Sequence, residues 1–215
     1  YSSEADLIAD IAKAYQQVAL DLYDAGLRVL QLDDCTWGML AGFHAGAKDG
    51  TNKIDQAEID KNKELYVNVN NAFIEGLPED LIVNTHDCRG NYHSTWASAG
   101  GYESVAEPLF TREKVHAFFL EYDNDRSGGF EPLAQIQDDQ LVVLGLITSK
   151  SGELEDKQTV IDRIHEAAKY VPLDRLCLST QCGSASTEEV NILTEDQQWA
   201  KIPLAKDVAE EVWGA

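Results

Sequence analysis

The sequence predicts an α/β fold, a (β/α)8 barrel of which this chain supplies about the last five βα units. Five short β-rich runs alternate with helical stretches, which implies a parallel sheet with right-handed crossovers. A doubly wound sheet has the same alternation, but no glycine-rich phosphate loop follows any run. Polar residues end every run, and barrel enzymes keep their chemistry at the carboxyl ends of strands, so the barrel is favoured.

The first element is a helix over residues 4 to about 26, where apolar residues recur three and four positions apart and Gly26 is a natural stop. Strands are predicted at 27–32, 81–85, 115–120, 141–147 and 176–179, because these runs are rich in β-branched and large apolar residues. Further helices are predicted at roughly 55–76, 102–112, 155–170 and 195–213. The connection from 35 to about 53 is interpreted as a lid or substrate loop, or equally as an ordinary surface insertion.

Five units cannot close an eight-stranded barrel, which typically needs about 250 residues. Residues 1–215 are therefore predicted to be the C-terminal portion of a single barrel domain, beginning in the helix before its fourth strand. An open β edge and an uncovered interior would follow. We expect the isolated chain to aggregate, to form a homo-oligomer, or to need the missing N-terminal part.

The chain is strongly acidic, with 38 Asp and Glu against 17 Lys and Arg and a formal net charge of −21. This charge repels phosphate backbones and anionic lipid, so neither nucleic acid nor a membrane surface is an expected partner. No apolar run reaches the ~18 residues of a spanning helix, and no signal-peptide pattern is present. We therefore expect a cytoplasmic location. We also expect the four cysteines to be free thiols or metal ligands.

A metal site is predicted from residues that end three different strands. His86 and Cys88 are two apart in an extended segment, so their side chains face the same side and can share one ion. Glu121 ends the next strand and Cys182 follows the last one. Two thiolates, an imidazole and a carboxylate are suitable tetrahedral zinc ligands.

The other two cysteines are not part of this predicted set. Cys177 is five residues before Cys182, so strand parity places it on the opposite face, as a buried apolar thiol. Cys35 is near the barrel mouth, in the first loop, and spacing fixes no partner for it.

Three segments, 85–91 (THDCRGN), 119–123 (FLEYD) and 181–183 (QCG), resemble the catalytic domain of cobalamin-independent methionine synthase, especially short relatives without its N-terminal domain. Segment 30–34 (LQLDD) resembles the family's strand that ends in an Asp. The resemblance extends along essentially the whole chain. It implies a UROD/methionine-synthase-like barrel whose first three units are absent here.

The resemblance also implies a function, namely zinc-dependent methyl transfer to the thiol of homocysteine, with methionine as product. The family's zinc ligands match His86, Cys88, Glu121 and Cys182, and the Asp that holds the homocysteine amino group matches Asp33. Zinc deprotonates a bound thiol, and the thiolate is the nucleophile. If the substrate thiolate displaces Glu121, the charge of the site is unchanged.

Lys150 marks a departure from the family pattern. In the full-length enzyme a histidine assigned as proton donor to the folate follows this strand, and Lys150 is the nearest match here. A lysine, with a reference pKa of ~10.4, donates protons poorly at neutral pH unless burial lowers its pKa. The methyl donor therefore stays open between a methyl-folate, a methylated corrinoid carrier and another methyl compound. A solvated loop lysine is the alternative interpretation of Lys150.

Two other functions stay open. A barrel hydrolase would use Asp33 or Asp34 with Glu121 as a carboxylate pair, but this leaves the His and Cys residues unexplained. Alternatively, the chain is a catalytically incomplete fragment that binds zinc without turnover.

Overall fold

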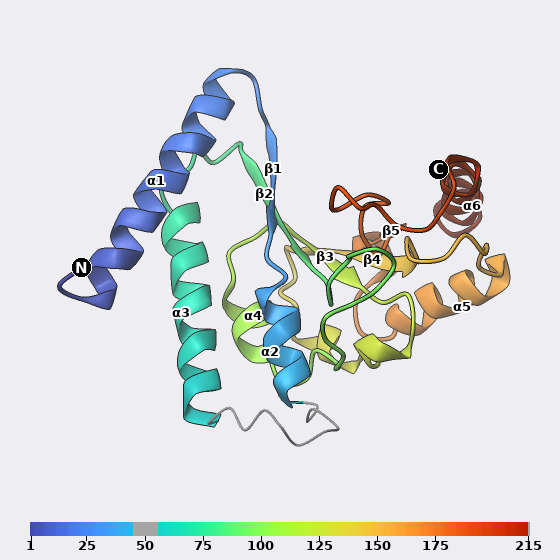
Figure 1. Ribbon diagram of the computed structural model, residues 1–215, viewed down its shortest axis with the longest axis horizontal. Coiled ribbons are helices and arrows are strands. Elements are labelled where there is room, and N and C mark those ends of the chain that lie inside the picture. The colour runs from blue at the N-terminus through green and yellow to red at the C-terminus, as the bar shows by residue number, and fades with distance from the viewer. Residues whose placement is uncertain (45–55, 215) are drawn as a thin grey trace.

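The computed structural model describes residues 1–44 and 56–214, and its centre is a parallel sheet of five strands (Figure 1). These strands are β1 (Val29–Asp33), β2 (Ile82–Asp87), β3 (Ala117–Glu121), β4 (Leu141–Ile147) and β5 (Leu176–Thr180). They lie in sequence order, and each neighbouring pair is parallel. All carboxyl ends therefore meet at one edge. This is the strand order of a barrel wall, and it confirms the predicted five βα units of a truncated barrel.

The helices pack along this wall (Figure 1). They are α1 (Glu4–Asp24), α2 (Thr36–His44), α3 (Gln56–Ile74), α4 (Ala106–Arg112), α5 (Lys157–Ala167) and α6 (Glu195–Trp213), with short 3-10 turns at Asp125–Ser127, Glu131–Gln135 and Leu173–Arg175. Figure 1 shows α1 and α3 side by side at one end of the molecule and α5 and α6 at the other. The two termini consequently lie far apart.

Several helix boundaries are encoded by local capping residues. Ser3 accepts a hydrogen bond from the Asp6 amide at the start of α1, and Gly26, with a φ of 109°, follows its end. At α6, Thr194 and Gln197 form a reciprocal capping box. These side chains explain why both predicted helices agree with the structure to within about two residues.

Two predicted segments differ from the structure. Residues 36–44 form α2 rather than a loop, anchored by the fully buried ring of Trp37; the rest of that predicted connection lies outside the described residues. Helix α4 begins at Ala106 rather than near 102. Tyr102 is fully buried in the turn before it, and its hydroxyl donates to the Asp87 carbonyl at 3.2 Å.

The two faces of the sheet have different surroundings. Phe118, Leu120 and Leu144 point toward the helices and form the core with them. On the opposite, inner face, His86 pairs with Phe119 in the strand register, and both line a cavity. This inner face is the interior wall of the partial barrel.

The prediction that Cys177 lies on the face opposite the site is wrong. In the register, Cys177 pairs with Val143 and Ser179 pairs with Gly145, and Ser179 lines the inner-face cavity. Cys177 is two residues before Ser179, so it shares this inner face and is half-buried. Strand parity failed because β5 ends at Thr180, before the chain reaches Cys182.

Strands β1 and β5 are the two edges of the sheet within residues 1–44 and 56–214, so this part of the chain does not close into a barrel. Over the same residues, no helix has the combination of length and apolar composition needed to cross a bilayer.

Candidate metal centre

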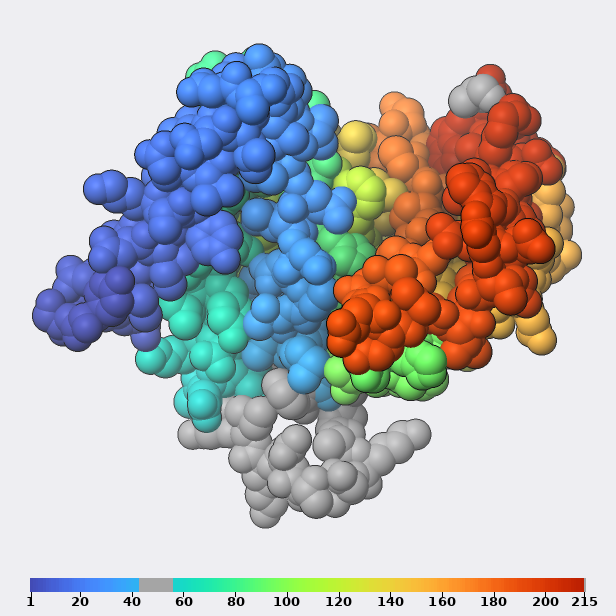
Figure 2. Space-filling model, turned by 45° about the horizontal axis from the view of Figure 1, so that its top comes forward, coloured from blue at the N-terminus to red at the C-terminus, as the bar shows by residue number. Residues whose placement is uncertain are grey.

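A cavity of about 490 Å³ lies at the carboxyl ends of the strands, on the inner face. Asp33 and Cys35 from the end of β1, His86 and Cys88 from the end of β2, and Cys182 after β5 all line it. Figure 2 shows the surface hollowed between the blue N-terminal part and the orange-to-red C-terminal part. The cavity occupies the position where barrel enzymes carry their active sites.

Cys88 is the centre of two overlapping groups of metal-ligating side chains. In one group, donor atoms of Cys88, Glu121 and Cys182 all lie within 4.8 Å of one another, and all three residues are buried. In the other, Cys88 is grouped in the same way with Cys35 and His86. The Sγ atom of Cys182 is 3.3 Å from Nε2 of His86, which joins the two groups. The structure thus brings all four predicted ligands together and adds Cys35.

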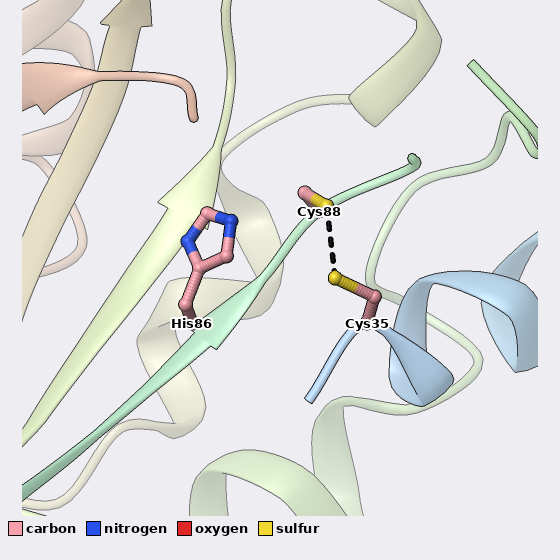
Figure 3. Close-up of side chains that lie close together, drawn as sticks. All are labelled: Cys35, His86 and Cys88. Atoms are coloured by element: carbon pink, nitrogen blue, oxygen red, sulfur yellow. Dashed lines mark hydrogen bonds between the residues drawn. The ribbon is translucent and has the colours of Figure 1, made fainter. Parts of the chain in front are cut away.

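Cys35 lies closer to Cys88 than sequence spacing could indicate. The two Sγ atoms are 3.0 Å apart, although 53 residues separate them along the chain (Figure 3). Cys35 also donates from Sγ to Oδ1 of Asp33 at 3.2 Å. A third thiol therefore stands beside the predicted metal ligands and beside the predicted substrate-binding carboxylate.

The sulfur groups shift one another's pKa values. Hydrogen bonds from Cys182 and Cys35, together with one from His86, hold the pKa of Cys88 well below its usual range. The hydrogen bond to Cys88, together with burial, raises the pKa of both Cys35 and Cys182. Burial by itself would lower the pKa of His86, but the hydrogen bond and charge of Cys88 raise it.

Glu121 is fully buried and is held by groups outside the donor set. Its Oε1 accepts from Nε of Arg126 at 2.7 Å, and its Oε2 accepts from the backbone amide of Arg89 at 3.1 Å. Arg126 also donates to Asp123 at 2.7 Å. This second carboxylate keeps the guanidinium, and through it Glu121, in one orientation.

The donor set fits zinc by its chemistry. Thiolate, imidazole and carboxylate are the three protein ligand types of this ion, and sites rich in cysteine select it over harder cations. Ligand atoms that bind one zinc ion at about 2.0–2.3 Å lie roughly 3–4 Å apart, within the separations found around Cys88. Burial of Cys88, Glu121 and Cys182 limits competition from water.

Lys150 is buried, which contradicts the alternative of a solvated loop lysine. Only 7% of the residue is exposed, and its Nζ donates to the Gly90 carbonyl at 2.7 Å and to Oδ1 of Asn91 at 2.8 Å. Burial lowers the pKa of the Lys150 amine. Gly90 and Asn91 line the cavity, while Lys150 lines a neighbouring cavity of about 460 Å³ beside Trp96. The Lys150 side chain therefore lines the second cavity while its amine binds two residues that line the first.

The two aspartates after β1 face different surroundings. Asp33 is exposed on the cavity, where a substrate amino group could reach it. Asp34 instead accepts from Nδ2 of Asn70 on α3 at 2.6 Å, and the same Nδ2 donates to Glu113 at 2.9 Å. Asp34 is thus bound to the helical layer. This arrangement disfavours Asp34 as half of a hydrolytic carboxylate pair.

Sequence reasoning missed Arg126 and the participation of Cys35. Both follow a strand end by a few residues, Arg126 five after Glu121 and Cys35 two after Asp33. Proximity to a strand end is a usable signal, because parallel strands bring all such positions to one edge. This signal indicates that a residue lies near the site, but not which side chain it contacts there.

Fold and site together define a partial (β/α)8 barrel with a cysteine-rich candidate metal centre at the carboxyl ends of its strands. The family model for the catalytic domain of cobalamin-independent synthase matches residues 2–209. The chain therefore belongs to the cobalamin-independent methionine synthase family, as the sequence motifs predicted.

Individual proteins are similar to this chain. The chain is 44% identical to the uncharacterized protein YxjH of Bacillus subtilis, over 99% of this chain and 56% of that one. A solved structure from Listeria monocytogenes, assigned to the vitamin-B12-independent methionine synthases, is 37% identical and has a TM-score of 0.74, covering 97% of this chain and 56% of that one. A B12-independent methionine synthase from Shewanella, solved with selenomethionine, is 23% identical, with a TM-score of 0.72 over 99% of this chain and 56% of that one. The chain thus spans about half the length of these relatives.

Proposed function

We propose that this chain carries the zinc site of a methyltransferase that transfers a methyl group to the thiol of homocysteine and forms methionine. The observation that carries the proposal is the convergence of His86, Cys88 and Cys182 with the buried Glu121, at the cavity that Asp33 also lines. Family membership supports the reaction class. The Shewanella relative binds selenomethionine, an analogue of the proposed product, which supports homocysteine as acceptor.

In this proposal His86, Cys88, Glu121 and Cys182 hold the zinc ion. Bound zinc would supply one effect, which is to keep the acceptor sulfur deprotonated at neutral pH. The buried ion pair of Arg126 with Glu121 orients the carboxylate ligand. Asp33, exposed on the same cavity, accepts a hydrogen bond from the ammonium group of homocysteine and so fixes the direction of its thiol.

Lys150 is proposed as the proton source for the leaving methyl carrier. Two of its three N–H groups bind Gly90 and Asn91, so one stays available. Burial lowers its pKa, which is the direction that makes an ammonium group a better proton donor at neutral pH. The neighbouring cavity beside Trp96 and Arg126 offers room for part of the carrier, either a methyl-folate or another methyl compound.

A carboxylate-pair hydrolase is the weaker candidate. The buried Glu121 already binds Arg126 and the Arg89 amide, so it is poorly placed to protonate a leaving group. A fragment that binds zinc without turnover is the other possibility, because the chain spans about half the length of its relatives. For the leading candidate, we propose that residues 1–215 are the C-terminal portion of a single catalytic barrel domain and that the enzyme is cytoplasmic.

The deciding experiment is metal analysis of protein purified without chelator or added metal. We expect about one zinc ion per chain, and loss of most of it in Cys88→Ser, which removes the shared thiolate. Cys177→Ser is the matched control, because this half-buried thiol lies outside both ligand groups and should keep its zinc. Zinc-loaded protein is then assayed for methionine with homocysteine and candidate donors. Equal zinc in Cys88→Ser and the wild type would reject the site, and zinc without methionine formation would favour the incomplete fragment.

A further inference from the structure

Lys150 is a buried cation that is held by neutral groups. Its Nζ donates to the Gly90 carbonyl at 2.7 Å and to Oδ1 of Asn91 at 2.8 Å. Lys201, which is also buried, is instead paired with the Glu155 carboxylate at 3.1 Å. Within residues 1–44 and 56–214, Lys150 has no such carboxylate partner. Its two direct contacts must therefore hold the ammonium group without an ion pair.

Charged groups act on the Lys150 amine without touching it. They belong to Cys182, Glu121, Asp123 and Arg126. Burial, the largest influence, lowers the pKa of the amine; the first three groups raise this pKa, and the Arg126 charge lowers it. Arg126 is itself paired with Glu121 and Asp123, each at 2.7 Å. The direct contacts of the amine, rather than these charges, therefore determine where it lies.

The side-chain amide of Asn91 uses all of its hydrogen-bonding positions. Its Oδ1 accepts from Nζ of Lys150 and from Nδ2 of Asn191, the latter at 3.0 Å. Its Nδ2 donates to the Gly183 carbonyl at 2.7 Å and to Oγ of Ser186 at 2.6 Å. Rotation of the amide by half a turn would direct Nδ2 at two N–H donors and Oδ1 at a carbonyl oxygen. The amide oxygen is therefore fixed toward Lys150.

Asn191 secures Asn91 from the loop that follows β5. Only 4% of Asn191 is exposed, its Nδ2 also donates to the Ser149 carbonyl at 2.7 Å, and its Oδ1 accepts from the Ser94 amide at 2.8 Å. The backbone on both sides of this contact is left-handed, with a φ of 60° at Ser94 and 49° at Val190. Such conformations, above all in a β-branched residue, persist only where surrounding contacts impose them. The loops after β2 and β5 are therefore held together around Asn91.

We propose that Asn91 is a positioning residue, whose neutral amide oxygen fixes the Lys150 ammonium group against the loop that follows Cys182. The inference rests on the proposed function, in which Lys150 is the proton source, and goes beyond it because it assigns the group that places the amine. A carboxylate at this position would also accept from Lys150, but its charge would favour the ammonium form and make it a weaker proton donor. The amide of Asn91 provides the contact without the charge.

Competitive labelling of amines with trace acetic anhydride over a range of pH tests the inference, with mass spectrometry of the peptide that contains Lys150. The midpoint of the labelling curve reports the pKa of the amine, and the plateau reports its accessibility. We expect Asn91→Leu, which removes the acceptor, to raise the plateau about tenfold, the factor for loss of one hydrogen bond. Asn91→Asp keeps the acceptor, so its plateau should match the wild type while its midpoint moves to higher pH.

Asn71→Leu and Asn71→Asp are the matched controls. Asn71 of α3 donates to the Arg112 carbonyl and accepts from the Lys114 amide, and it lines neither cavity. Both control variants should leave the Lys150 curve at its wild-type midpoint and plateau. Circular dichroism and urea unfolding identify any variant that does not fold. Asn91→Asp exchanges only the amide nitrogen for oxygen, so it carries the test if Asn91→Leu does not fold.

Three results would overturn the role of Asn91. They are an unchanged plateau in folded Asn91→Leu, an unchanged midpoint in Asn91→Asp, and a plateau in Asn91→Asp as high as in Asn91→Leu. The last would show that the acceptor oxygen does not hold the amine. Labelling needs neither zinc nor a methyl donor, so a protein without zinc would reject the proposed metal centre and still test Asn91.

The pH–rate profile separates the inference from the proposed role of Lys150. In a form of the protein that turns over, Asn91→Asp should move the alkaline limb of the profile to higher pH, together with the labelling midpoint. A limb that stays in place while the midpoint moves would reject Lys150 as the proton source, and its contact with Asn91 would stand.

Discussion

Arg126 donates from Nε to Oε1 of Glu121 at 2.7 Å, and the ion pair is almost completely shielded from solvent, with side-chain exposures of 6% and 0%. Arg126 is not a candidate ligand, yet it determines where one carboxylate of the metal centre points. Groups that orient a ligand in this way commonly change metal affinity when they are removed.

Replacement of Arg126 should therefore weaken zinc binding. We expect Arg126→Gln to lower zinc affinity about 10–100-fold, measured by competition with a chromophoric chelator, and Arg126→Lys to recover part of the loss. Arg112→Gln is the matched control, because it breaks the Arg112–Glu64 ion pair on the surface and should leave zinc affinity unchanged. An Arg126→Gln protein that melts earlier but binds zinc normally would reduce Arg126 to a purely structural role.

Asp33 should control acceptor binding without affecting the metal. In Asp33→Asn, loss of the charged hydrogen bond to the homocysteine ammonium group should weaken binding by about 10–100-fold, as measured by titration calorimetry of zinc-loaded protein. Zinc content should stay at the wild-type value. The exposed Asp80, which binds Tyr23 away from the cavity, provides the control Asp80→Asn. Unchanged homocysteine affinity in Asp33→Asn would contradict the assignment.

Lys150 is expected to have both a structural and a chemical effect. Lys150→Met leaves the Gly90 carbonyl and Asn91 Oδ1 without this donor, which should lower the free energy of unfolding by about 1–3 kcal/mol. Lys114→Met is the control, since the exposed Lys114 pairs with Glu75 and lines neither cavity. Stability is measured by urea unfolding.

The proton-donor role of Lys150 requires a second measurement. In a form of the protein that turns over, Lys150→Met should remove the alkaline limb of the pH–rate profile, whereas Lys114→Met should leave the profile in place. An identical profile in the wild type and Lys150→Met would restrict Lys150 to bracing the loop at Gly90.

Glu113 should make the protein less stable as pH rises. Burial, with a further contribution from the charge of Asp34, raises the pKa of Glu113 to about 8, whereas an unfolded glutamate titrates near ~4.3. The folded state therefore favours the protonated form. This contribution is fully present below the unfolded pKa and is lost as pH rises through the folded pKa.

The slope from this one group is up to about 1.4 kcal/mol per pH unit between those two pKa values. Glu113→Gln, which mimics the neutral acid, should flatten the dependence of unfolding free energy on pH between about 5 and 8. Urea unfolding at several pH values measures this, with the exposed Glu107→Gln as control. Parallel curves for the wild type and Glu113→Gln would contradict the assigned protonation.

The strand pattern and the main motif could be predicted from the sequence because both depend on neighbouring residues. Leu141–Ile147 is an apolar run that becomes β4 with the same bounds. His86 and Cys88 are two apart at the end of an extended segment, so their common orientation follows from strand geometry. Cys177 shows the limit of this reasoning. Side chains alternate between the two faces only within a strand, and β5 ends before Cys182, so the spacing between Cys177 and Cys182 does not tell which face Cys177 is on.

The sequence by itself determined the order of five βα units, the family and the four predicted ligands, because alternation, motif and residue type are properties of short segments. Only the tertiary structure decided that Cys35 meets Cys88, that Arg126 holds Glu121 and that Lys150 is buried. These contacts depend on how closely separate segments pack, as when Gly38 lets α2 touch the backbone of Cys88. No local spacing encodes such an approach, because the distance is set by side chains from both segments at once.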